Sequence, residues 1–280
     1  MNKVAVLGAG TMGHGIAQIC AVAGMEVALR DLNDELIGKG RAGIEASLGK
    51  LVDKGKVEAA ARDAALARIS TTTDLAAAVK DADLVVEAIP ELMPLKVETF
   101  RALAAHAPPH AILATNTSSL SVTEIGAASG TPERVVGLHF FNPVPIMALL
   151  EIVRGLSTSD ATIGAARAFA ERVGKEPIVV NDFPGFATSR LGVILGCEAI
   201  RMLESGVASA ADIDKAMELG YRHPMGPLKL TDLVGLDVRL AILEHLHREL
   251  GEQFRPPALL RQMVRAGKLG RKSGEGFYKY

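Results

Sequence analysis

The sequence predicts an α/β domain with helices on both faces of its sheet, followed by an all-helical domain. Up to residue 182, short apolar runs alternate with stretches of helical periodicity, which is the pattern of a mostly parallel sheet. A glycine-rich turn joins the first apolar run to the first helix. Beyond Pro184 we find only helical patterns. We therefore expect a boundary near residue 183, with domains at 1–183 and 184–280.

The first domain is expected to begin with a strand and a helix. KVAVLGAG (3–10) is apolar and ends in glycine, as buried parallel strands often do, and a helix follows over 11–24. A second strand then precedes a helix over 34–56, where apolar residues recur at helical spacing. In chain order, the strands after the first are expected at 25–31, 82–90, 111–118, 134–141, 149–153 and 176–182. A further helical stretch is expected at 58–69.

The second domain is expected to contain four helices. The first has proline near its start and glycine at its end, which is the asymmetry that helix ends favour. The second has Ser209 as its N-cap and Gly220 at its end. In chain order the helices cover residues 184–206, 209–220, 232–250 and 257–267.

The composition excludes several classes of function. The chain of 280 residues is 49% hydrophobic with a formal net charge of -1, so no bulk attraction to nucleic acid is expected. Its apolar runs are shorter than the roughly 20 residues that span a bilayer, so no membrane association is expected. Cys20 and Cys197 have neither a metal-ligand spacing nor a disulfide pattern. We expect no metal and a reducing, cytoplasmic setting.

The turn GAGTMG predicts a Rossmann-type dinucleotide site. Gly8 permits a tight turn, Gly10 lets the backbone approach a pyrophosphate, and Gly13 allows the helix to pack closely on the strand. Thr11 and Met12 lie at the helix amino terminus, where free N–H groups attract phosphate. Asp31 closes the second strand and suits the ribose hydroxyls, which favours NAD over NADP, although Arg30 keeps NADP open.

A histidine and a glutamate lie in the otherwise apolar segment LHFFNPVPIMALLEIV. His139 and Ser118 each lie near the end of a predicted strand, where ligands of such sheets gather. If LLEIV returns antiparallel, Glu151 lies beside His139, where it orients the imidazole and stabilises its charged form. Alcohol oxidation by NAD needs such a base. The alternative is a core histidine beside an unrelated glutamate.

These motifs resemble those of the 3-hydroxyacyl-CoA dehydrogenase family, in particular its short monofunctional members such as 3-hydroxybutyryl-CoA dehydrogenases. The resemblance covers essentially the whole chain and includes GAGTMGHGIAQ, NTSSL, GLHFFNPVPIMALLEIV, PGFATSR, YRHPMGPLKLTDLVGLD and GRKSGEGFYKY. It implies an NAD domain, a helical substrate and dimerisation domain, and a homodimer. It also implies interconversion of L-3-hydroxyacyl-CoA and 3-oxoacyl-CoA in fatty acid or butanoate metabolism. Acyl chain length and the physiological direction stay open.

The resemblance implies roles for individual residues. His139 matches the general acid/base, Glu151 the glutamate that orients it, and Ser118 a serine that contacts substrate and cofactor. The other matches are cofactor contacts at Glu91, Lys96, Asn142 and Lys272, and coenzyme A contacts at Ser47 and Lys54. Because the helix 34–56 has a basic face, a phosphate-rich carrier and a merely solvated charged face both explain the last two positions.

One residue departs from the family pattern. Ser189 in PGFATSR stands where family members often have an asparagine that positions the substrate. Serine is shorter and donates one hydrogen bond, so the substrate contact could be made through water or could have moved to Thr188.

Two other functions remain as alternatives. Gulonate-type sugar-acid dehydrogenases share this architecture and much of the histidine motif, and the basic helix favours a CoA ester over a free sugar acid only weakly. A non-catalytic NAD(H)-binding protein would explain the glycine turn, but such a protein has no use for an acid–base pair.

Overall fold

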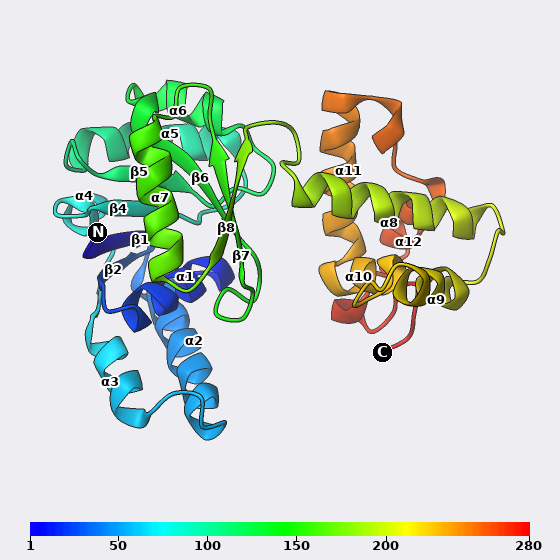
Figure 1. Cartoon of the computed structure of the whole chain (residues 1–280), viewed down its shortest axis with the longest axis horizontal. Coiled ribbons are helices and arrows are strands. Elements are labelled where there is room, and N and C mark those ends of the chain that lie inside the picture. The colour runs from blue at the N-terminus through cyan, green and yellow to red at the C-terminus, as the bar shows by residue number, and fades with distance from the viewer. The chain divides into compact units, whose positions relative to one another are not determined.

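Eight strands form one sheet in the amino-terminal part of the chain (Figure 1). Their order is β3-β2-β1-β4-β5-β6-β7-β8, and all neighbours are parallel except β6 and β7. The structure, a computed structural model, describes residues 1–280 and divides into two compact units, Met1–Asp182 and Phe183–Tyr280. The strands are β1 (Lys3–Leu7), β2 (Glu26–Arg30), β3 (Ile69–Thr72), β4 (Leu84–Glu87), β5 (Ile112–Thr115), β6 (Val135–Phe140), β7 (Leu149–Arg154) and β8 (Glu176–Asn181).

Seven α-helices accompany the sheet. They are α1 (Thr11–Val22), α2 (Asp34–Asp53), α3 (Ala59–Ala67), α4 (Leu75–Val79), α5 (Met93–His106), α6 (Val122–Ser129) and α7 (Asp160–Arg172). Short polar side chains start several of them: Asn33 caps α2, Ser121 caps α6 and Ser159 caps α7, each accepting a hydrogen bond from a first-turn N–H. These caps place each helix start at a defined residue.

The two faces of the sheet have different partners. Buried residues of α1, α2, α3 and α7 share one apolar core with Val86, Ala114 and Leu138 of the strands. The helices α5 and α6 pack against each other, and α6 contacts β6. Because side chains alternate along a strand, Glu87, Thr115 and His139 point to the face opposite that apolar core. The polar residues of three strands therefore share one side of the sheet.

The second unit is helical, as expected (Figure 1). It contains α8 (Thr188–Glu204), α9 (Ala210–Gly220), α10 (Pro227–Val234), α11 (Leu236–Leu250) and α12 (Ala258–Arg265). Ser209 caps α9, as predicted from its sequence. The apolar core of this unit includes Val193, Ile213, Leu228 and Leu243. None of the helices in either unit combines the length and the apolar character needed to cross a bilayer.

The structure confirms the predicted fold class and corrects two details. The sequence analysis missed β3, an edge strand whose residues Ile69–Thr72 are short and mostly polar. The helix expected over 232–250 is two helices, because Gly235 has φ 106° and ends α10. Glycine reaches this positive φ without steric cost, so it separates two helices that the apolar pattern alone joins.

Candidate active site

The glycine turn joins β1 to α1. Gly8 has φ 95°, and a Cβ there would lie 2.6 Å from the Ala88 carbonyl oxygen. A Cβ on Gly13 would lie 1.7 Å from the Gly8 oxygen, whereas a Cβ on Gly10 would have no neighbour within 4 Å. Gly8 and Gly13 are therefore required by packing, and Gly10 faces open space. No side chain caps the amino terminus of α1, so its first-turn N–H groups are directed at that space.

Asp31 follows β2 and holds the glycine turn. Its Oδ2 accepts a hydrogen bond from the Ala9 N–H at 2.6 Å, and its Oδ1 accepts one from the Leu32 N–H at 2.7 Å. Each oxygen keeps further acceptor capacity. The neighbouring Arg30 donates from Nε to the Thr73 carbonyl at 3.1 Å. Its guanidinium is thus partly engaged by the backbone next to β3.

A cavity of about 640 Å³ lies along this turn. Its lining includes Gly8, Gly10, Thr11, Met12 and Asp31. An uncapped helix amino terminus, a glycine that leaves room for another molecule, and an acceptor carboxylate at the end of β2 fit the pyrophosphate and ribose of a dinucleotide. The residues present therefore fit NAD.

His139 and Glu151 face each other across an antiparallel pair of strands. They are register partners on β6 and β7, and His139 Nδ1 lies 2.7 Å from Glu151 Oε2. Both residues are buried, with 7% of His139 and 0% of Glu151 exposed. Because a carboxylate accepts a hydrogen bond only from a protonated Nδ1, the neutral ring carries its basic lone pair at Nε2. The predicted antiparallel return of LLEIV is thus confirmed.

The turn that carries Ser118 follows β5 and is held by one glutamate. Glu91 Oε1 accepts from the Thr117 hydroxyl at 2.5 Å and from the Ser118 N–H at 2.9 Å. Glu91 Oε2 lies 3.3 Å from Lys96 Nζ, which lies 2.7 Å from Glu87 Oε1. Glu91 and Lys96, near the start of α5, therefore form one connected group with Ser118, which lies after the next strand.

Two polar residues at the ends of strands were missed by the sequence analysis. Glu87 is the last residue of β4 and is 0% exposed. Asn116 follows β5, and its Oδ1 accepts from the Phe140 N–H at 2.9 Å, which ties the end of β5 to the strand that carries His139. The sequence signal that could have identified Glu87 is its position as a glutamate at the end of the otherwise apolar run LVVE.

The remaining predicted residues lie elsewhere in the two units. Asn142 follows β6, and its peptide bond to Pro143 is cis. Ser47 lies in α2, and Lys54 is exposed directly after the end of that helix. Ser189 and Lys272 belong to the second unit, where Lys272 Nζ lies 2.6 Å from Asp237. The roles of these five residues stay predictions.

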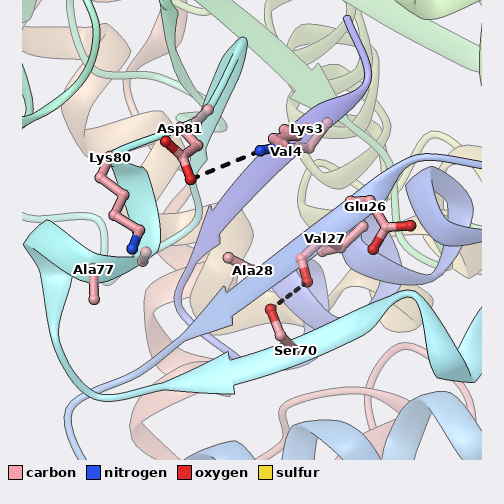
Figure 2. Close-up of a pocket in the computed structure, with 11 residues that line it drawn as sticks. Lys3, Val4, Glu26, Val27, Ala28, Ser70, Ala77, Lys80 and Asp81 are labelled. Carbon is pink, nitrogen blue, oxygen red and sulfur yellow. Dashed lines mark hydrogen bonds and ion pairs between the residues drawn. The ribbon is translucent and has the colours of Figure 1, made fainter.

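A smaller cavity of about 220 Å³ lies at the opposite edge of the sheet, where β1 and β2 begin (Figure 2). Figure 2 shows the Lys3 ammonium facing Asp81 at 3.7 Å and the Ser70 hydroxyl donating to the Val27 carbonyl at 3.1 Å. None of the predicted site residues lines it. The candidate site therefore lies at the carboxyl ends of the strands.

Comparisons with known proteins match both units of the chain. Residues 3–183 match the NAD binding domain of 3-hydroxyacyl-CoA dehydrogenase, and residues 185–280 match the C-terminal domain of the same enzyme. A probable 3-hydroxybutyryl-CoA dehydrogenase of Deinococcus radiodurans is 50% identical over 279 residues, covering 99% of this chain and 100% of the relative. A 3-hydroxybutyryl-CoA dehydrogenase of Bradyrhizobium diazoefficiens is 44% identical over 284 residues, covering 100% and 96%.

Solved structures show the same likeness. The crystal structure of FadB2 from Mycobacterium tuberculosis has a TM-score of 0.96 at 45% identity, covering 100% of this chain and 99% of that one. The (S)-3-hydroxybutyryl-CoA dehydrogenase PaaH1 from Ralstonia eutropha also has a TM-score of 0.96, at 44% identity and with the same coverage.

Proposed function

The chain belongs to the 3-hydroxyacyl-CoA dehydrogenase family, and we propose that it oxidises L-3-hydroxyacyl-CoA, with 3-hydroxybutyryl-CoA as its main substrate, to 3-oxoacyl-CoA and catalyses the reverse reaction. The observation that carries this proposal is the buried His139–Glu151 pair with its 2.7 Å contact. It supplies an oriented base at the carboxyl ends of the strands, in a unit whose first turn fits NAD. Relatives named 3-hydroxybutyryl-CoA dehydrogenase favour this substrate over a free sugar acid.

The residues of the pair divide the acid–base work. His139 takes the proton of the substrate hydroxyl at Nε2 during oxidation and returns it during reduction. Glu151 holds the ring through Nδ1 and stabilises the imidazolium that forms. Ser118 donates a hydrogen bond to the 3-oxygen and so keeps the reacting carbon in place. NAD, when bound, supplies the hydride acceptor.

Asp31 supports a preference for NAD over NADP. Its carboxylate lines the 640 Å³ cavity and has acceptor capacity left for ribose hydroxyls. The same negative charge repels a 2′-phosphate. Gly8, Gly10, Gly13, Thr11 and Met12 would hold the pyrophosphate, and Glu91, Lys96, Asn142 and Lys272 would complete the cofactor site.

The coenzyme A carrier is assigned to α2. Ser47 is half-buried on this helix, which also carries Lys39 and Lys50, and Lys54 is exposed directly after its end. These groups suit the phosphates of coenzyme A. We assign Ser189 to the acyl end of the substrate, where its single hydroxyl replaces the family asparagine.

We also propose that the protein is a homodimer through its helical unit. In this unit Leu191 and Leu195, one turn apart on α8, are 63% and 44% exposed, and Val238 on α11 is 41% exposed. Exposed apolar side chains of this kind are typical of a surface that another chain covers. Sedimentation equilibrium of the purified chain measures the mass that decides this.

The first experiment mixes the purified protein with acetoacetyl-CoA and NADH and follows the absorbance of NADH. The same measurement is repeated with NADPH. We expect rapid loss with NADH and slow loss with NADPH, because Asp31 disfavours the 2′-phosphate. Rapid loss with NADPH alone would overturn the cofactor assignment, and no loss with either would overturn the substrate assignment.

A further inference from the structure

Glu87 is a buried carboxylate whose two oxygens are both in use. Oε1 accepts from Lys96 Nζ at 2.7 Å and from the Ile89 N–H at 2.8 Å, and Oε2 accepts from the Thr115 hydroxyl at 2.7 Å. Its side chain is 0% exposed. A charge removed from water this completely persists only where several partners compensate it. The three donors are therefore what keeps this carboxylate at the end of β4.

Lys96 is as deeply buried as its partner. It lies in the first turn of α5, only 1% of its side chain is exposed, and its ammonium joins Glu87 at 2.7 Å to Glu91 Oε2 at 3.3 Å. An ammonium in this position acts on its surroundings through the two carboxylates it contacts. Glu91 is 38% exposed, so it is the member of the group that faces the outside.

Glu91 passes this constraint to the turn after β5. Its Oε2 is held by Lys96, which leaves Oε1 directed at the turn. That single oxygen accepts from four donors of three consecutive residues, namely the Thr117 hydroxyl at 2.5 Å, the Ser118 N–H at 2.9 Å, the Ser118 hydroxyl at 3.4 Å and the Ser119 hydroxyl at 3.5 Å. The orientation of Ser118 therefore depends on where Lys96 holds Glu91.

The geometry of the sheet connects the same residues a second time. Glu87 and Thr115 are register partners on β4 and β5, and Thr115 is the partner of Gly137 on β6. His139 lies two residues farther along β6, on the same face of the sheet. Glu87 thus has two connections to this region. It holds the end of β5 directly through Thr115, and it holds the turn after β5 indirectly through Lys96 and Glu91.

We propose that Glu87 is a positioning residue, which acts through Lys96 and Glu91 to hold the backbone of the turn that carries Ser118, so that the hydroxyl of this residue stays within reach of the substrate. This inference rests on the proposed function, in which Ser118 contacts the 3-oxygen of the substrate. It also gives Lys96 a second role beside the proposed cofactor contact, because the lysine fixes Glu91.

The test compares Glu87→Gln with the double variant Glu87→Gln/Lys96→Met. The single variant leaves a buried ammonium with less compensation, so it lowers Tm as well as activity. The double variant removes both charges and replaces the lysine by an apolar chain of similar length, so it recovers most of the lost Tm. Asp81→Asn is the matched control, because it breaks the exposed Lys3–Asp81 pair at the opposite edge of the sheet.

Three quantities are measured for each variant: Tm, kcat/KM with acetoacetyl-CoA, and hydrogen exchange of the amides of residues 117–119 relative to those of β5. We expect both Glu87 variants to lose kcat/KM by roughly tenfold to a hundredfold, the usual cost of a small misplacement of a reacting group. We also expect selectively faster exchange at residues 117–119. The control should match the wild type in all three quantities.

Two results would overturn the inference. One is a double variant with wild-type kcat/KM, which would give Glu87 and Lys96 a purely structural role. The other is exchange that rises equally across β5 and the turn, or that does not change at residues 117–119. If the wild type does not turn over acetoacetyl-CoA, the proposed function fails, and the exchange measurement still decides whether Glu87 anchors the turn.

Discussion

The proposed role of His139 depends on a short contact inside the protein. The ring is 7% exposed, and a carboxylate that is fully buried holds its Nδ1 at 2.7 Å. A carboxylate that accepts a hydrogen bond from Nδ1 fixes which nitrogen of the neutral ring is basic. The Phe141 ring lies beside it, with 4.5 Å between the two ring centroids, and restricts the orientation of the imidazole further. The result is a base with one orientation and one reactive atom.

Replacing His139 by Ala is expected to lower kcat by roughly 10²–10⁴, the range for the loss of a general base. Cofactor binding should persist, because the glycine turn and Asp31 do not depend on the ring. Steady-state kinetics with acetoacetyl-CoA and NADH, together with titration of NADH fluorescence, measure both quantities. Near-normal turnover by this variant would remove His139 from the mechanism.

Glu151→Gln tests the charge of the partner and keeps its shape. The amide cannot stabilise electrostatically the imidazolium that forms when His139 takes the substrate proton. We therefore expect kcat/KM for alcohol oxidation, measured by steady-state kinetics, to fall. A kcat/KM equal to that of the wild type would show that Glu151 does not act through its charge.

At the scale of elements, the glycines of the β1–α1 turn differ in their surroundings. Gly13 and Gly8 allow the helix to approach the strand, whereas Gly10 has no neighbour within 4 Å of a built Cβ. Gly10 also has φ -66°, which alanine adopts readily. The same motif therefore contains glycines that packing requires and a glycine that we propose leaves room for the ligand.

Gly13→Ala is expected to lower stability, whereas Gly10→Ala is expected to weaken cofactor binding. Gly13→Ala should lower the free energy of unfolding at the upper end of the ~1–3 kcal/mol typical of overpacking, since its Cβ would meet the Gly8 oxygen. Gly10→Ala should change stability by less than about 1 kcal/mol. It should nevertheless raise the Kd for NADH roughly tenfold, which corresponds to a loss of about 1.4 kcal/mol.

Urea unfolding and NADH fluorescence titration separate these two effects. Equal losses of stability in the two variants would contradict the packing argument for Gly13. An unchanged Kd in Gly10→Ala would place the pyrophosphate away from this residue.

At the scale of the whole molecule, each unit has its own buried polar anchor. In the second unit Asp214 is 0% exposed and accepts from the N–H groups of Leu228 and Lys229 at the start of α10. The Tyr278 hydroxyl donates to the same carboxylate at 2.6 Å. This contact joins the end of the chain to the helical core. Burial and the nearby Asp214 carboxylate raise the pKa of Tyr278 above its ordinary value of 10.0.

The raised pKa predicts a loss of stability at alkaline pH. Above about pH 10 the unfolded chain releases the Tyr278 proton while the folded chain keeps it, so the free energy of unfolding falls as pH rises. Tyr278→Phe should be less stable at neutral pH, because Asp214 loses a donor, yet its Tm should fall less steeply with pH. Calorimetry between pH 8 and 11 compares the slopes, with Tyr221→Phe, at an exposed tyrosine, as the control. Parallel slopes in wild type and Tyr278→Phe would contradict this argument.

The sequence by itself determined the features that local periodicity and short spacings encode. The alternation of apolar runs predicted the sheet, GAGTMG predicted the turn at the end of β1, and the short NPVP connection predicted that Glu151 returns beside His139. In the last two cases the residues involved lie within one strand–turn–helix or one hairpin. Their relative positions therefore follow from the geometry of that one unit.

Only the tertiary structure decided which distant residues meet. Glu87, Lys96 and Glu91 become one group with Ser118 because β4 and β5 pair in a particular register and because α5 buries the lysine beside that pair. The edge strand β3 has no apolar signal of its own and forms because β2 offers it unpaired backbone groups. Contacts between separate elements depend on register and on the packing of helices over a sheet. A local pattern of residues encodes neither of these, and so they arise only when the whole sheet is assembled.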